Sequence, residues 1–209
     1  IAGNGILYSS EHWRICKDRL RPGGLLAQWL PLYQVSPTDF ATIIRTFLEV
    51  FPDATMWFCG IDGVLIGTKE GLRIDLRRMG EHMSTPVVAG DLLSMGVQRP
   101  ADVLGWYVAG PDQLDAMGGD APVNRVERPV LEFTAPKAIR LQLVASTMPA
   151  LLAALEQLPE QQAWQQLQGM CSHRLDPGTL RAVSQAREAG RWLMRGQLLA
   201  SYEYGSQYL

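Results

Sequence analysis

The sequence predicts an α/β protein in which the C-terminal half of a doubly wound sheet, ending in an antiparallel hairpin, is followed by an α-helical tail. Helical and strand-like patterns alternate over residues 9–59, as in a doubly wound sheet. Two short β-type segments flank the turn sequence GIDG, which indicates the hairpin. Residues 148–209 are rich in alanine and glutamine and lack strand signals, which predicts the tail. Such a sheet normally begins with further β-α units, and none precedes residue 9, so we expect only its second half.

The first helix is expected to start after Ser9. Serine is a favoured N-cap, and Glu11 places an acid in the first turn, where the helix dipole favours it. Arg-Pro-Gly-Gly at residues 21–24 is a strong stop signal. The apolar run at residues 25–30 is too short for a helix and follows two glycines, so it is expected to be a buried strand.

A second helix is expected after Ser36. Serine caps the helix, Pro37 suits the first helical position, and Asp39 lies where a capping box carries an acid. One continuous apolar face follows, which indicates that this helix packs against the core. Residues 55–59 and 64–68 are the two expected strands of the hairpin.

The rest of the chain divides by composition. We expect residues 1–72 to form the second half of the sheet domain, and residues 148–209 to form a helical appendage with a helix starting at Asp176-Pro177. Between them, residues 73–147 are expected to be a Pro/Gly-rich extension with short helices. These short helices are expected at residues 90–96, 100–109 and 111–117.

Composition and charge exclude several classes of protein. A net charge of −2 gives no electrostatic reason to propose nucleic acid as a partner. Three cysteines far apart in the sequence predict reduced thiols, which fits a cytoplasmic location. No apolar run approaches the roughly 18 residues of a membrane span, and we expect no signal peptide. Because the chain starts at Ile1 in the middle of a pattern, we expect a fragment of a longer protein.

Common catalytic motifs are missing from the sequence. It contains no G-x-S-x-G, no P-loop and no H-E-x-x-H. Gly3-Asn4-Gly5 lacks the third glycine of a dinucleotide fingerprint, because Tyr8 occupies that position. The three histidines are isolated from cysteines and acidic clusters, so we expect no metal site.

Several longer motifs occur in a defined order. They are LYSSEHW at 7–13, LRPGG at 20–24, QWLPLYQVSP at 28–37, TFLEVFP at 46–52 and GDAPVNRVERPVLEFTAPK at 119–137. With these motifs, residues 1–140 resemble the spermidine synthase-like (polyamine aminopropyltransferase) family. They look closest to the bacterial branch in which this domain is fused to membrane segments. The sequence departs from that pattern where Arg125-Val126-Glu127 replaces Thr-Asp-Asp.

The resemblance implies a Rossmann-like, methyltransferase-type sheet that binds decarboxylated S-adenosylmethionine and a small polyamine. In such enzymes an amine nitrogen attacks the carbon next to the sulfonium, so the amine must be deprotonated and in line. The family's glycine-rich loop and catalytic acids lie upstream of the position of Ile1. No catalytic residue is therefore assignable in this chain, and no metal is implied.

The resemblance also implies candidate substrate-binding residues. Gln28 matches an amine-contacting glutamine in a strand whose end faces the ligand crevice. Trp57 lies near a position that carries an aromatic against the diamine, and Trp29, Tyr33 and Gln34 neighbour the same strand exit. The alternatives are that Gln28 satisfies buried polar groups and that the tryptophans belong to the core.

Two other functions stay open. One is a methyltransferase-like domain that acts on another acceptor. The other is a non-catalytic binding module in which the tail recruits a partner through Trp164, Trp192, Tyr202, Tyr204 and Tyr208. A homo-oligomer also stays open. The resemblance allows the parent protein to carry membrane helices, in which case this chain would be a cytosolic domain of an inner-membrane protein.

Overall fold

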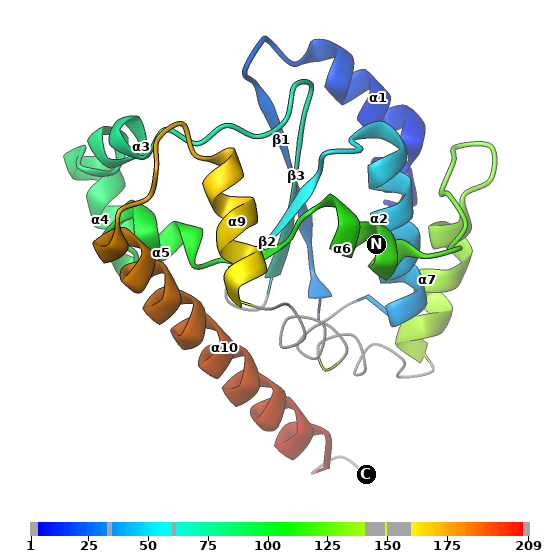
Figure 1. Ribbon diagram of the computed structural model, residues 1–209. Helices are drawn as coiled ribbons and strands as arrows, with labels where there is room; N and C mark the ends of the chain where they lie inside the picture. The colour runs from blue at the N-terminus through cyan, green and yellow to red at the C-terminus, as the bar shows by residue number, and fades with distance from the viewer. Residues whose placement is uncertain (1–3, 33–34, 60–61, 141–148, 150–159, 207–209) are drawn as a thin grey trace.

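The computed structural model describes residues 4–32, 35–59, 62–140, 149 and 160–206 (Figure 1). Two of the candidate residues, Tyr33 and Gln34, lie outside this part of the chain. The strands are β1 (Leu25–Leu30), β2 (Thr55–Cys59), β3 (Asp62–Thr68) and β4 (Tyr107–Ala109). The helices are η1 (Gly5–Tyr8), α1 (Ser10–Arg19), α2 (Pro37–Val50), α3 (Leu76–Met83), α4 (Pro86–Ser94), α5 (Pro100–Leu104), α6 (Pro111–Gly118), α7 (Val130–Arg140), α9 (Glu160–Met170) and α10 (Pro177–Ser206).

The four strands form one open sheet in the order β1-β3-β2-β4, in which all neighbours are antiparallel. Because β1 and β2 both pair with β3, they run in the same direction, and α2 connects them. The predicted α/β class and the β2–β3 hairpin are therefore confirmed. The sheet continues beyond the hairpin, however, because β4 pairs with the other edge of β2.

Helix starts follow the capping signals in the sequence. Ser9 Oγ accepts a hydrogen bond from the His12 N–H at 3.2 Å, and Ser36 Oγ accepts one from the Asp39 N–H at 3.1 Å. At the start of α10, Asp176 Oδ1 accepts from the backbone of residues 178 and 179 at 2.8 and 3.0 Å. These three predicted helix starts are confirmed, since each side chain satisfies donors that the first turn leaves unpaired.

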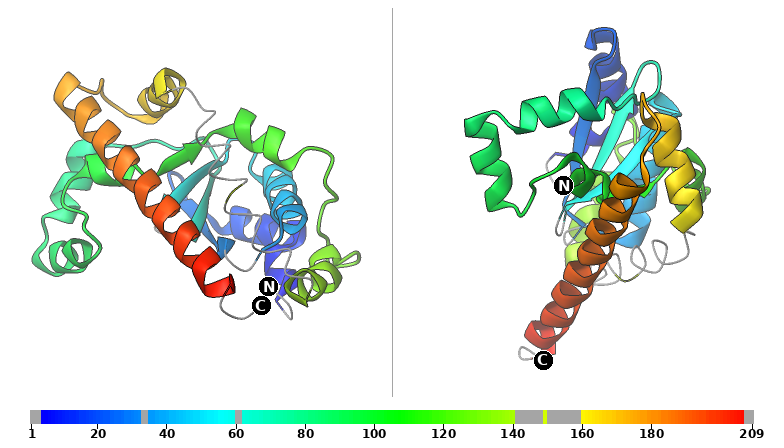
Figure 2. Two further views of the ribbon diagram at one scale, coloured as in Figure 1. Left: turned by 90° about the horizontal axis from the view of Figure 1, so that it is seen from below. Right: turned by 60° about the vertical axis from the view of Figure 1, so that its left-hand side comes forward.

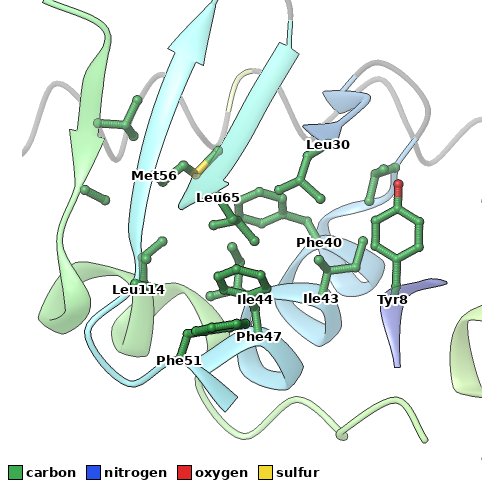
Figure 3. Close-up of a cluster of buried hydrophobic side chains, with 14 of the residues drawn as sticks. Tyr8, Leu30, Phe40, Ile43, Ile44, Phe47, Phe51, Met56, Leu65 and Leu114 are labelled. Carbon is green, nitrogen blue, oxygen red and sulfur yellow. The ribbon is translucent and has the colours of Figure 1, made fainter. Parts of the chain in front are cut away.

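One face of the sheet carries the larger core. Helices α1, α2, α6 and α7 cover this face, and α2 contributes more of the buried side chains than any other element (Figures 1 and 3). Phe51 packs so closely on β3 that a Cβ at Gly67 would lie 2.5 Å from its ring. The labelled core side chains are Tyr8, Leu30, Phe40, Ile43, Ile44, Phe47, Phe51, Met56, Leu65 and Leu114.

The opposite face of the sheet is covered by α5 and by the described part of the tail, α9 and α10 (Figure 1). Leu167 from α9 and Val183 from α10 are buried in a second core with Trp57 and Tyr107. A parallel bridge between Ile74 and Cys171 further ties the tail to the chain after β3. The expected helical tail therefore contributes to the core of the sheet domain.

The extension at residues 73–147 has more helix than predicted, because α3 and α7 were not expected, and one segment differs in type. Residues 107–109, expected to be helical, form strand β4, because their pairing with β2 buries all three side chains. Helices α3 and α4 bury no residue, and α10 extends past the sheet with Trp192 63% exposed (Figure 2). Among the described helices, none is both long and apolar enough to cross a membrane.

Candidate functional site

Alternation of side chains in β1 separates the candidate residues onto two faces of the sheet. Gln28 lies on the face covered by α1 and α2, where it contacts Trp13, together with Leu30, which is fully buried. Leu25 and Trp29 lie on the opposite face and are 51% and 49% exposed. Successive strand residues point to opposite faces, so neighbours in the sequence do not share a site.

Gln28 is held by a small polar cluster. Its Oε1 accepts a hydrogen bond from Trp13 Nε1 at 3.0 Å, and its Nε2 donates to the Trp29 carbonyl at 3.1 Å. The Tyr8 hydroxyl donates to the same carbonyl at 3.3 Å. Burial raises the pKa of Tyr8 more than the nearby Gln28 side chain lowers it, so the phenol stays neutral at physiological pH. The cluster therefore positions Gln28 and has no ionised group of its own.

The strand that carries Gln28 lies at the edge of the sheet. β1 pairs with β3 on one side, and within the described residues no strand pairs with its other side. An exposed edge presents unpaired backbone N–H and C=O groups to any strand that approaches. The Gln28 side chain is half-buried beside this edge.

Trp57 lies in β2 on the other face. The strand register places Trp29, Val64 and Trp57 in one row across β1, β3 and β2. The Trp57 ring packs edge-on against Tyr107 with ring centroids 5.4 Å apart, and its Nε1 donates to Thr55 Oγ1 at 2.9 Å. The structure therefore brings Trp29 and Trp57 onto one face and separates both from Gln28.

Next to Trp57 lies a cavity of about 620 Å³, which we call the Trp57 cavity. This volume falls in the range of small-molecule sites, which are concave and mostly apolar. The sheet provides its floor, and α3, α5 and the segment before α3 provide its walls. The apolar lining includes Trp57, Val64, Ile66, Leu72, Ile74 and Trp106.

Polar groups at the Trp57 cavity come mainly from α3 and the segment before it. Arg73, Arg78 and His82 line it together with Asp75. The Arg78 and Arg77 backbone N–H groups donate to Asp75 Oδ1, each at 3.0 Å, and the Arg78 bond is the main cause that lowers the pKa of Asp75. Asp75 is therefore an ionised helix cap, and cationic side chains outnumber acids at this cavity.

Cys59 is the one thiol that lines the Trp57 cavity among the described residues. Burial raises the pKa of Cys59, and the charge of Asp62 raises it further. A raised pKa keeps the thiol protonated at neutral pH, so Cys59 has little nucleophilic character. The cavity can therefore bind an apolar molecule but offers no activated cysteine.

No group of three or more His, Cys, Asp or Glu residues with metal-binding geometry occurs in the described part of the chain. Comparisons with protein-family models, with curated proteins and with solved structures find no match for this chain. A function must therefore be argued from the residues themselves.

Sequence reasoning did not find the Trp57 cavity. Much of its lining comes from residues 72–82, where the sequence shows mixed charge, and from residues 103–106, and neither segment carries a catalytic motif. Trp106 immediately precedes β4, a segment for which the sequence predicts a helix. Its position beside Trp57 therefore depends on the pairing of β4 with β2. Of the lining residues, only Trp57 is among the candidates that the sequence predicts.

Proposed function

We propose that this chain is part of a spermidine synthase-like transferase, which moves an aminopropyl group from decarboxylated S-adenosylmethionine to a polyamine. The observation that carries the proposal is Gln28, half-buried on an open edge strand and oriented by Trp13. The β1-α2-β2 unit, in which the two strands run in the same direction, is compatible with a Rossmann-like sheet.

The chemistry assigns a binding role to Gln28. A carboxamide oxygen has two acceptor positions, and Trp13 Nε1 uses one of them. The second can accept a hydrogen bond from the amine of a polyamine and hold its nitrogen in line with the sulfonium carbon. In the reaction the nitrogen–carbon bond forms as the carbon–sulfur bond breaks, and the electron pair stays on the neutral thioether.

Other parts of this reaction need residues that the sequence does not contain. Residues 1–209 have no glycine-rich cofactor loop and no recognisable acid pair for deprotonating the amine. We propose that a further part of the sheet supplies them by pairing with the open edge of β1. This edge lies beside Gln28, so an added strand would bring its own residues next to the carboxamide.

The test measures 5′-methylthioadenosine formed from decarboxylated S-adenosylmethionine and putrescine by the polypeptide as its gene encodes it. Gln28→Leu should lower kcat/KM at least about tenfold, the equivalent of one lost hydrogen bond. Gln28→Glu, which keeps an acceptor, should retain more activity than Gln28→Leu. Gln185→Leu is the matched control, because Gln185 is exposed on α10. Wild-type polypeptide that forms no product with any polyamine contradicts the proposal.

A second candidate function is binding of an apolar small molecule without catalysis. The observation that favours it is the Trp57 cavity, whose lining is mostly apolar and lies on the face opposite Gln28. Titration with an apolar anionic dye such as anilinonaphthalene sulfonate should quench Trp57 and Trp106 fluorescence. Val64→Asp, which places a charge in the cavity, should abolish this quenching. Unchanged dye affinity in that variant would exclude the cavity as the site.

A further inference from the structure

Arg187 is a buried cation in the contact between α10 and the sheet. Its side chain and backbone together are only 8% exposed, whereas arginine is normally one of the most exposed residues. Two of its side-chain nitrogens, Nε and Nη2, are buried and make no hydrogen bond. A buried charge without hydrogen bonds is costly, so such groups are usually paired.

The two nitrogens without hydrogen bonds define a binding direction. In the guanidinium group, Nε–H and the outer Nη2–H point the same way and form one edge of the plane. Two parallel donors of this kind match the two oxygens of a carboxylate, which they bind side-on with high specificity. A spherical ion cannot use both donors with the same geometry. The free edge of Arg187 is therefore a carboxylate-shaped donor pair.

Arg187 lines a small cavity. Its volume is about 20 Å³, and its lining includes Arg187, Arg191, Gly105, Gly190, Trp106 and Tyr107. A single water occupies roughly 10–15 Å³, so the space suits one small group. Neither Gly105 nor Gly190 has a side chain that could fill the cavity.

Charges around the cavity favour an anion. Burial is the main cause that lowers the pKa of Arg187, and the positive charge of Arg191 lowers it further. Tyr107 and Glu160 oppose this shift, but the Tyr107 hydroxyl already donates to Gln166 Oε1 at 2.8 Å. Glu160 accepts a hydrogen bond from the Ser184 hydroxyl. An added carboxylate would provide the hydrogen bonds that neither group makes to Nε or Nη2 of Arg187.

We propose that this cavity binds a small free carboxylate anion, held side-on by Nε and Nη2 of Arg187 beside the positive charge of Arg191. The site lies between α10 and the segment that leads into β4; Trp106 belongs to its lining and to that of the Trp57 cavity, whereas Gln28 belongs to neither. Its occupancy would stabilise the packing of α10 on the sheet, because it neutralises a cation that this packing buries. The inference does not depend on the proposed transferase function.

The test measures thermal unfolding of the whole chain in formate, acetate, benzoate and chloride at equal ionic strength. Formate at a hundred times its dissociation constant should raise Tm by about 5–10 °C. Acetate should act similarly, whereas benzoate and chloride should not. In Arg187→Lys, which keeps the charge but loses the planar donor pair, the formate effect should disappear. Arg181→Lys, an exposed change on the same helix, should retain it.

A spectroscopic measurement keeps the proposal testable if Arg187→Lys fails to fold. In wild-type protein labelled with ¹⁵N, saturating formate should shift the Arg187 Nε–H resonance downfield, and chloride should not. Equal Tm rises in wild type and Arg187→Lys would overturn the proposal. So would an Nε–H resonance that does not move at saturating formate, which would mean that the cavity holds water only.

Discussion

Asn124 connects three elements of the larger core, and its substitution provides the sharpest test of how that core packs. It is fully buried, and its Nδ2 donates to the Gly5 and Tyr8 carbonyls at 2.9 and 3.1 Å. Its Oδ1 accepts from the Leu131 N–H at 3.2 Å, and its own N–H donates to Thr46 Oγ1 at 2.9 Å. The residue thus joins η1, α2 and the start of α7.

Asn124→Ala removes three side-chain hydrogen bonds and leaves their backbone partners buried. Each bond contributes about 1 kcal/mol net, and each buried group left without a partner adds to the cost, so we expect a loss of about 3–5 kcal/mol. Proteins of this size unfold with about 5–15 kcal/mol, so the loss is a large fraction of the stability. The corresponding drop in Tm is about 6–20 °C.

Urea denaturation followed by circular dichroism measures this loss. Asn4→Ala is the control, because Asn4 is exposed and its side chain makes no capping hydrogen bond. Asn124→Asp keeps the side-chain volume but turns an oxygen toward the Gly5 and Tyr8 carbonyls. Burial should raise the pKa of the introduced carboxyl, so this variant should regain stability as the pH falls toward 4. An Asn124→Ala variant within about 1 kcal/mol of wild type would refute the reasoning.

Two further predictions concern the second face and the extension. Gly105→Ala would place a Cβ 2.5 Å from Ala186 Cβ and should lower the free energy of unfolding, measured in urea, by about 1–3 kcal/mol. In Gly90→Ala the new Cβ would have no neighbour within 4 Å, so this helical substitution should raise the free energy of unfolding by about 0.5–1 kcal/mol. Burial opposes the charge of Asp102, but hydrogen bonds from Arg99 and two backbone N–H groups lower its pKa below 3.8. A carboxyl group whose pKa is lower in the folded than in the unfolded state stabilises the fold at pH values above the unfolded-state pKa. Asp102→Ala should therefore lower the free energy of unfolding by about 1 kcal/mol at pH 7. This difference from wild type should vanish as the pH falls through the native pKa of Asp102. These predictions would be contradicted if both glycine variants changed the free energy of unfolding in the same direction, or if the effect of Asp102→Ala did not depend on pH.

Local signals in the sequence predicted the elements that local interactions determine. Ser9, Ser36 and Asp176 each begin a helix by accepting backbone hydrogen bonds from the first turn, so the cap and its partners are neighbours in the chain. The apolar face of α2 has helical spacing and is buried as expected. The hairpin likewise follows from a turn and two adjacent β-type segments.

Long-range pairing determined what the sequence did not predict. Tyr107–Ala109 has three residues and no distinct alternation, so only its position beside β2 makes it a strand. The tail packs on the sheet through contacts such as Leu167 with the second core, which no local pattern encodes. Asn124 was missed for the same reason, because its partners lie up to 119 positions away in the sequence.

The candidate site depends on which face of the sheet each strand residue occupies, and the sequence alone does not determine this. The family resemblance implies that Gln28 and Trp57 contact one substrate, and the two residues do lie in strands that run in the same direction. Their faces depend on the register of each strand with β3, where Gln28 pairs with Leu65 and Trp57 pairs with Val64. Adjacent residues of β3 point to opposite faces, so the two candidates lie on opposite sides of the sheet. Of the remaining candidates, Tyr33 and Gln34 lie outside the described residues, as do the side chains of Tyr202, Tyr204 and Tyr208.

This separation makes the two candidate functions independent in experiment. A polyamine that contacts Gln28 has to approach along the open edge of β1, because α1 and α2 cover the face on which Gln28 lies. A ligand of the Trp57 cavity approaches from the side of α3 and never meets Gln28. Gln28→Leu should therefore leave dye binding unchanged, and Val64→Asp should leave the polyamine contact of Gln28 intact. The opposite result would be that Gln28→Leu and Val64→Asp each impair both polyamine transfer and dye binding. One ligand would then contact both residues around the edge of β1. Trp29 would lie on its path, because this residue is on β1 and faces the cavity side.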